Sequence, residues 1–251
     1  MKFGSARTSI AARPAGLRVD LARLVARAGF TELLGRLHDR RRTSLVCLAY
    51  HRVLPFEAGT AHPFDAELVS ASPREFDSQM DYVRSCMTPV SLAEVADRLD
   101  RGEPMPPRAV AVTIDDGFRD AYVHAYPALR RHGVPATVFL STGYVDSGEP
   151  FWFELAASLV IRVPPHSLPV PGRTIRVPTG ASARERQAGV RELLESLKRL
   201  RAADRDALIR DWCRQYAALL DPQLLEGIRP LGWAQVREMS AGGVEFGSHT
   251  V

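Results

Sequence analysis

The chain has 251 residues, of which 45% are hydrophobic, and this length and composition can support one sizeable core with an insertion. Its formal charge is +4, and 33 of its residues are basic, of which Lys2 and Lys198 are the two lysines. Acidic residues are interleaved with the arginines, so a nucleic-acid-binding surface is not expected. The three cysteines, Cys47, Cys86 and Cys213, are scattered and odd in number, which argues against a disulfide framework or a cysteine-based zinc site.

The first 42 residues are predicted to be a tail followed by an amphipathic helix. Residues 1–17 are small and polar, and apolar residues recur at helical spacing from Val19 to Leu37. Flanking arginines would suit a membrane-surface or partner helix, but packing on its own domain is the favoured interpretation. Neither a signal peptide nor a transmembrane segment is evident, so we expect a cytoplasmic protein, or one peripheral to a membrane.

From residue 43 onward the sequence predicts alternating strands and helices. Apolar runs at residues 44–50, 89–90, 110–114 and 136–140 predict strands. Helices are expected to begin at the N-cap residues Ser72 and Ser91, and a further helix after Gly117 should be kinked or restarted by Pro127 and end at Gly133. Strands and helices joined by short connections predict right-handed βαβ units and a parallel sheet.

Residues 148–231 break this alternation. An aromatic run is followed by a Pro/Gly-rich stretch and then by two charged helices, predicted at about 182–203 and 204–219. We expect an inserted helical hairpin that packs against an α/β barrel or covers the mouth of that barrel. Trp152 and Trp212 are interpreted as core residues, and stacking of their rings on a glycan is the alternative. A helix at 232–240 and a closing strand from Val244 are predicted after the insertion.

The most informative stretch is Val110–Gly117, an apolar strand that runs into two carboxylates and a glycine. Folds of the α/β class place catalytic groups where strands end, and neighbouring carboxylates can serve as a cation ligand and a base. Asp-Asp-Gly is also an ordinary turn sequence. A second short apolar strand ends at His249, another residue that can bind a metal, and this favours the catalytic interpretation. His51 also follows a strand, where it could bind a metal directly or hydrogen-bond to other groups of the pocket.

These residues resemble two motifs of the NodB-type polysaccharide deacetylases, carbohydrate esterase family four. Thr113-Ile114-Asp115-Asp116-Gly117 is similar to the motif Thr-Phe-Asp-Asp-Gly, with Ile114 in place of Phe, and His249-Thr250-Val251 is similar to the start of His-Ser/Thr-x-x-His. The resemblance extends from about Ser44 to the C-terminus and includes Ala49-Tyr50-His51-Arg52-Val53 and Gly133-Val134-Pro135-Ala136-Thr137-Val138-Phe139.

The resemblance implies a fold and a set of roles. The fold is α/β, an incomplete (β/α) barrel over residues 43–251 with the helical insertion. Asp115 would be the general base, and Asp116 and His249 would bind a divalent metal, Zn²⁺ or another first-row ion. The implied reaction removes acetyl groups from N-acetylated sugars of a polysaccharide and leaves a free amine. The subgroup looks similar to deacetylases of bacterial exopolysaccharide assembly.

Two alternatives stay open, a phosphodiester hydrolase that uses the same side chains and a non-catalytic glycan-binding or assembly protein. The family's second histidine and its later motifs would lie beyond Val251. We therefore expect a fragment of a longer deacetylase that binds metal weakly and is inactive by itself. The sequence predicts no particular sugar, substrate-contacting residue or oligomeric state.

Overall fold

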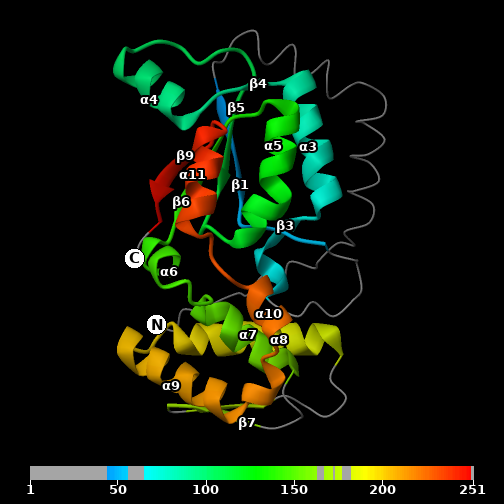
Figure 1. Cartoon of the computed structure of the whole chain (residues 1–251), viewed down its shortest axis with the longest axis vertical. Helices are drawn as coiled ribbons and strands as arrows, with labels where there is room; N and C mark the ends of the chain where they lie inside the picture. Colours follow the sequence, from blue (N-terminus) through cyan, green and yellow to red (C-terminus); the bar gives the residue numbers. More distant parts are fainter. Residues whose placement is uncertain (1–43, 56–64, 163–166, 172, 177–181, 250–251) are drawn as a thin grey trace, which may run out of the picture. The chain divides into compact units, whose positions relative to one another are not determined.

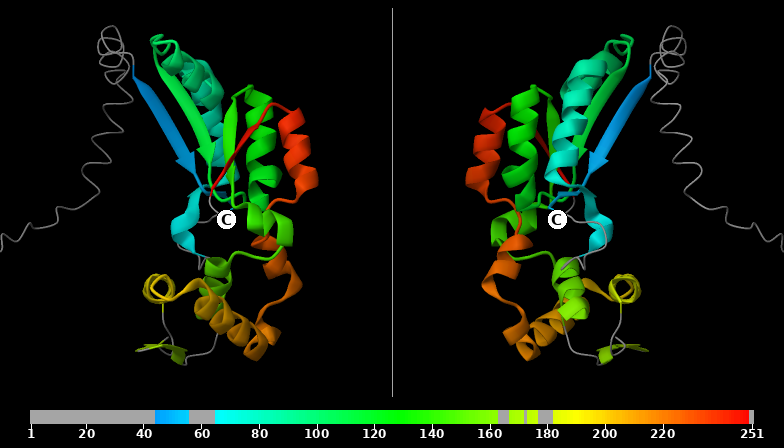
Figure 2. Two further views of the ribbon diagram at one scale, coloured as in Figure 1. Left: turned by 90° about the vertical axis from the view of Figure 1, so that its left-hand side faces the viewer. Right: turned by 90° about the vertical axis from the view of Figure 1, so that its right-hand side faces the viewer.

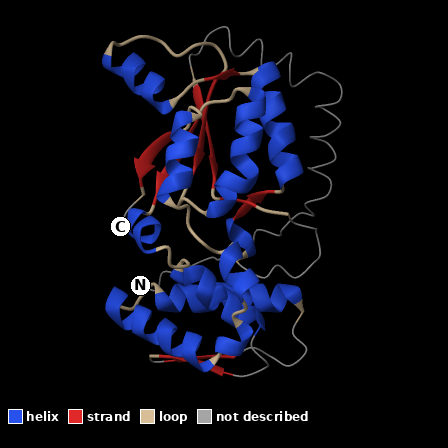
Figure 3. Cartoon of the chain, in the orientation of Figure 1, coloured by secondary structure: helices blue, strands red, loops and turns tan. Residues whose placement is uncertain are grey.

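A computed structural model describes residues 44–55, 65–162, 167–171, 173–176 and 182–249 of the chain (Figure 1). The predicted N-terminal tail and amphipathic helix, residues 1–42, lie outside the described residues. The chain from Leu45 to Val251 forms one compact unit, in which strands and helices alternate (Figure 3). The domain boundaries expected from the sequence stay a prediction.

The centre of this unit is a parallel sheet with the strand order β1-β5-β6-β9. Its strands are β1 (Leu45–Tyr50), β5 (Ala109–Ile114), β6 (Ala136–Leu140) and β9 (Glu245–Ser248), and the short β4 (Thr88–Pro89) pairs with the start of β5. Every residue of β5 is buried, as expected for a central strand covered on both faces. The predicted α/β class with a parallel sheet is confirmed. The described strands form an open sheet with β1 and β9 at its ends, and no barrel closure is seen among them.

Helices α3 (Pro73–Cys86), α5 (Tyr126–His132) and α11 (Trp233–Ala241) pack beside this sheet (Figure 2). Helix α4 (Leu92–Asp100) follows β4. The short strands β2 (Arg52–Val53) and β3 (Val69–Ala71) pair in parallel, and the 3-10 helix η1 (Ala66–Leu68) lies directly before β3. The predicted caps are confirmed, because the Ser72 and Ser91 side chains accept hydrogen bonds from the first-turn N–H groups of Glu75 and Glu94.

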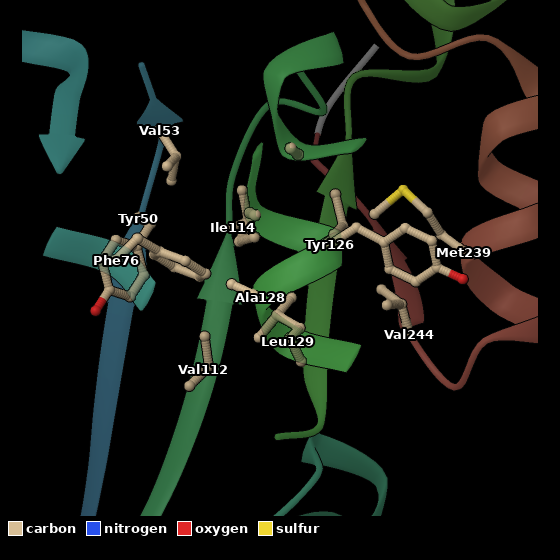
Figure 4. Packing of buried hydrophobic residues seen from close by; sticks show 14 of the residues in the cluster. Tyr50, Val53, Phe76, Val112, Ile114, Tyr126, Ala128, Leu129, Met239 and Val244 are labelled. Atoms are coloured by element: carbon tan, nitrogen blue, oxygen red, sulfur yellow. The ribbon is translucent and has the colours of Figure 1, made fainter. Parts of the chain in front are cut away.

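The main hydrophobic core lies between the sheet and these helices (Figure 4). The ring of Tyr50 meets the edge of Phe76 with ring centroids 4.9 Å apart, and Leu129 of α5 and Met239 of α11 are also buried in this cluster. Three apolar side chains of α3 are buried, those of Phe76, Met80 and Val83. Burial of apolar surface from both layers is therefore the main force that holds the helices on the sheet.

The helix predicted after Gly117 has two parts. A π-helical turn, η2 (Ala121–Ala125), leads into α5, and Pro127 lies in the first turn of α5. Pro127 has no N–H to donate to the preceding turn, so the regular α-helical hydrogen-bond pattern cannot continue through it. Gly133 ends α5 with a φ of +62°, a conformation that favours glycine. The interruption at Pro127 and the stop at Gly133 are both confirmed.

The inserted region contains the predicted helices, α8 (Ala183–Leu197) and α9 (Ala202–Gln215), and further elements that the sequence did not predict. Helix α6 (Thr142–Ser147) precedes the insertion, whose other elements are α7 (Trp152–Arg162), the antiparallel strands β7 (Ser167–Val170) and β8 (Arg173–Arg176), the 3-10 helix η3 (Ala217–Leu219) and α10 (Pro222–Gly227). Helix α7 is mostly apolar, and six of its eleven residues are buried. A mostly apolar run of this kind does not by itself distinguish a buried helix from a strand.

The insertion has a hydrophobic cluster of its own, in which Leu159 of α7, Leu193 and Leu197 of α8 and Trp212 of α9 are buried. None of the helices in the described part of the chain combines the length and the apolar character that a bilayer crossing needs.

Candidate active site

The carboxyl ends of β1, β5, β6 and β9 meet at one edge of the sheet, where backbone hydrogen bonds join them. The Asp115 N–H donates to the last carbonyl of β1 at 2.8 Å, and the His249 N–H donates to the last carbonyl of β6 at 2.8 Å. The Ser141 N–H donates to the Asp116 carbonyl at 3.1 Å. Because each bond joins neighbouring strand ends, the loops that carry Asp115, Asp116 and His249 are fixed relative to one another.

The structure brings the predicted site residues together at this edge. The His249 Nδ1 atom lies 3.8 Å from the Asp116 Oδ1 atom, and the His51 Nε2 atom lies 4.0 Å from the Asp115 Oδ2 atom. The Asp116 side chain is mostly buried, with 14% of its surface exposed, whereas His249 is 39% exposed. The pairing of a covered carboxylate with a more open imidazole is suited to a site that must admit a ligand. The individual roles of these residues stay predictions.

The backbone after β5 makes a tight turn that places the carboxylates. Asp116 has a φ of +68° and Gly117 a φ of +80°. Aspartate is among the few residues with a side chain that tolerate this left-handed region. A Cβ atom at Gly117 would lie 2.7 Å from the Leu140 side chain, so glycine is required for the close approach to β6 as well as for the backbone angle.

Burial raises the pKa of Asp116 above its ordinary value. The positive charges that His51 and His249 carry when protonated oppose this effect, and the neighbouring Asp115 carboxylate adds to it. The Asp116 carboxylate has little access to water and lies beside a second carboxylate, so a nearby cation would stabilise its ionised form. The electrostatics of this position therefore favour a bound positive ion.

Asp116 and His249 supply donor types that fit a first-row divalent metal, an imidazole nitrogen and a carboxylate oxygen. The two donor atoms lie 3.8 Å apart, close enough for both to contact one ion. Among the residues that the structure describes, no three His, Cys, Asp or Glu side chains form a group that could hold a metal ion. His51 therefore does not complete a three-residue set with this pair.

A buried charged cluster next to the site was missed by the sequence analysis. Arg52 directly follows His51, and its guanidinium donates to Asp120 at 2.8 Å and to Glu154 of α7 at 2.5 Å. A third hydrogen bond goes to the Gly227 carbonyl at 2.5 Å. The signal that could have revealed the cluster is Glu154 itself, because an acidic residue inside an apolar run must have a partner when it is buried.

The tryptophans of the insertion are placed as expected for core residues. Trp212 is 2% exposed within the hydrophobic cluster of the insertion, and this prediction is confirmed. Trp152 is partly buried against the same cluster, and the Arg205 guanidinium lies 4.4 Å from its ring centroid. The Trp152 ring therefore has the Arg205 guanidinium against it and stays partly exposed, lining a pocket of the insertion.

Comparison with known proteins agrees with the motifs at the strand ends. Poly-beta-1,6-N-acetyl-D-glucosamine N-deacetylases of Staphylococcus aureus strain MSSA476 and Staphylococcus epidermidis strain ATCC 35984 are 30% identical over 114 residues and 27% identical over 113 residues. Each alignment covers 42% of this chain, and 38% and 39% of the respective relative. The matched segment therefore spans well under half the length of these relatives.

Among solved structures, the Streptococcus pyogenes deacetylase PplD in complex with acetate is similar at 20% identity and a TM-score of 0.45, over 82% of this chain and 56% of that one. IcaB from Ammonifex degensii is similar at 21% identity and a TM-score of 0.37, over 84% and 92%. The sequence model of the polysaccharide deacetylase family matches residues 102–251, more than half of the chain. This range includes the Asp-Asp-Gly turn after β5 and the histidine after β9, and the chain belongs to the polysaccharide deacetylase family.

Proposed function

We propose that this site belongs to a metal-dependent hydrolase that removes acetyl groups from the N-acetylated sugars of a polysaccharide. The observation that carries the proposal is the convergence of Asp115, Asp116 and His249 at the carboxyl edge of the sheet, within the range that matches the family. The relatives named as deacetylases of poly-β-1,6-N-acetylglucosamine support this class of substrate.

Asp116 and His249 would hold the metal, which we assign as Zn²⁺. When bound, a metal of this kind polarises the amide carbonyl and activates the attacking water. Asp115 would accept the proton of that water through its carboxylate. The water oxygen forms a bond to the acetyl carbon, the C–N bond breaks, and the proton taken from the water passes to the departing nitrogen. The products are the free amine of the sugar and acetic acid, which ionises to acetate in solution. The His51 Nε2 atom lies 4.0 Å from Asp115 Oδ2, beside the carboxylate assigned as the base.

The proposal is tested by separating the metal ligands from the base. Asp116→Asn and His249→Gln should weaken Zn²⁺ binding, measured by calorimetry, by at least about tenfold. Asparagine tolerates the left-handed backbone of Asp116, so that variant removes charge and leaves the turn intact. Asp115→Asn is the matched control, and we expect it to retain Zn²⁺ while losing any acetate release that the wild type shows from β-1,6-linked N-acetylglucosamine oligosaccharides.

Two results would contradict the proposal. One is Zn²⁺ binding by the wild type that is no tighter than binding by a chain with both ligand substitutions. The other is hydrolysis of phosphodiesters without release of acetate from N-acetylated sugars.

A further inference from the structure

Trp233 differs from the other tryptophans of the chain because its side chain is exposed. It is 40% exposed, whereas Trp212 is 2% exposed and Trp152 is partly buried beneath Arg205. Exposure of a large aromatic ring leaves apolar surface in water, and such surface often marks a binding site. Trp233 therefore presents apolar ring surface to solvent, and its position in the fold decides whether a ligand could use that surface.

Trp233 is the first residue of α11, and α11 begins at the end of the sheet where β5 and β9 end. The N–H of Leu231 donates to the Gly117 carbonyl at 2.8 Å, which ties the start of α11 to the turn that carries Asp116. Two residues of chain reach at most about 7 Å, so the Trp233 backbone lies near this turn. A ring at this position can meet the same glycan chain that enters the site.

The ring of Trp233 is held in place by α6. Its Nε1–H donates to the Asp146 carboxylate at 2.7 Å, and Figure 1 shows α6 close to the start of α11. Helix α6 begins directly after Ser141, whose hydroxyl donates to the His249 carbonyl at 3.1 Å. The polar atom of the indole is therefore satisfied, and the apolar atoms remain available in an orientation that is coupled to the site.

A fixed indole matches one face of a β-linked hexose, because the axial C–H groups of the pyranose ring form an apolar surface. A rigid aromatic side chain loses little conformational entropy when a ligand packs on it. We propose that Trp233 forms a sugar-binding subsite that packs against a pyranose ring next to the one deacetylated, with Asp146 as the residue that positions the indole. The inference rests on the proposed function and adds a substrate contact to it.

The test compares ligands of two lengths on the full chain. Trp233→Ala should weaken the binding of a β-1,6-linked N-acetylglucosamine pentasaccharide by roughly five- to tenfold in calorimetry, and Trp233→Phe should weaken it less. Binding of the N-acetylglucosamine monosaccharide should not change, because one sugar in the site does not reach the subsite. In the wild type the pentasaccharide should also shift the tryptophan emission, and Trp233→Phe should remove most of this shift because Trp233 is the most exposed tryptophan of the chain.

Tyr82→Ala is the matched control. Tyr82 is an aromatic residue, 52% exposed, near the end of α3, and α3 leads into β4 at the opposite end of β5. It should leave pentasaccharide binding unchanged. Equal pentasaccharide affinity in the wild type and in Trp233→Ala would overturn the subsite and leave the proposed function standing. A wild-type chain that binds no N-acetylated oligosaccharide would overturn both.

Discussion

The sheet region and the inserted region are built in different ways. The sheet region buries apolar side chains between parallel strands and flanking helices, and the candidate active site lies at the carboxyl edge of its strands. The insertion buries a separate cluster around α7, α8 and α9. None of the predicted site residues belongs to the insertion. The difference shows that the candidate active site and the second hydrophobic cluster lie in separate regions of the chain. The contacts between these regions therefore decide whether a change in one of them affects the other.

Charged and aromatic side chains make the contacts between the two regions, and these contacts are called the joint below. Arg52, which follows His51, pairs with Glu154 of α7, and both side chains are almost completely buried. Phe118, which follows Gly117, has its ring centroid 4.3 Å from that of Phe151, and the Arg52 guanidinium lies 4.3 Å from the same Phe118 ring. Residues adjacent to the two site loops therefore contact the insertion. A substitution that removes these contacts should also shift the loops that carry the site residues.

The largest effect is expected from breaking the joint with Arg52→Met. This change leaves Asp120 and Glu154 buried without their cation, and loss of one partner of a buried pair costs about 3–5 kcal/mol. The measurement is the free energy of unfolding in urea. Arg191→Met is the control, because its pair with Glu67 is exposed and should contribute about 0–1 kcal/mol. Similar losses in the two variants would show that the buried cluster does not hold the regions together.

Cavities in the two cores test whether the regions unfold together. Leu197→Ala in the insertion and Leu129→Ala in α5 each remove a buried side chain, and each should cost about 2–5 kcal/mol. Because the buried joint links the cores, we expect either variant to speed amide hydrogen exchange in both regions. Faster exchange confined to the insertion in Leu197→Ala would instead identify the insertion as an independent folding unit.

The joint should also make stability depend on pH. Burial raises the pKa of Glu154 from 4.5 to about 7, although the charge of Arg52 opposes the shift. The folded protein then binds more protons than the unfolded chain between these values, so this group makes the free energy of unfolding fall as the pH rises from 4.5 to 7. The upper limit of the change is roughly 3 kcal/mol.

Glu154→Gln removes this titration and keeps the shape of the side chain. The stability difference between Glu154→Gln and the wild type should therefore change with pH in that window and be constant above it. The Asp65 N–H donates to the same carboxylate at 3.0 Å, and the Asp65 carboxylate adds to the upward shift. A difference that is independent of pH would show that Glu154 is ionised throughout the window, with Arg52 as a sufficient partner.

The smallest effects are expected at two matched helix caps, one in each region. Ser72 begins α3 and Ser182 begins α8, and each forms a capping box with the glutamate three residues later, Glu75 or Glu185. Replacement of either serine by alanine should cost about 1 kcal/mol in thermal or urea unfolding. Equal losses in a single transition would support coupling of the regions, whereas a second transition in Ser182→Ala would contradict it.

Much of the sheet region could be predicted from the sequence because its signals are local. The buried run before Asp115 and Asp116, the caps at Ser72 and Ser91 and the stop at Gly133 all depend on residues close together in the chain. Helix α7 and the hairpin β7–β8 were not predicted. The α7 sequence is a mostly apolar run that does not distinguish a buried helix from a strand, and the sequence around β7 and β8 is interrupted by proline and glycine. The burial of these elements depends on residues elsewhere in the chain.

The sequence by itself determined the parallel α/β class, the strand ends that carry Asp115, Asp116 and His249, and the family. These features are encoded by hydrophobic patterns and short motifs. Only the tertiary structure decided that Arg52 pairs with Glu154, which is 102 positions away, and that Trp233 is the exposed tryptophan. The physical reason is that burial and pairing are properties of a side chain's neighbours in space, and folding brings those neighbours from distant parts of the chain.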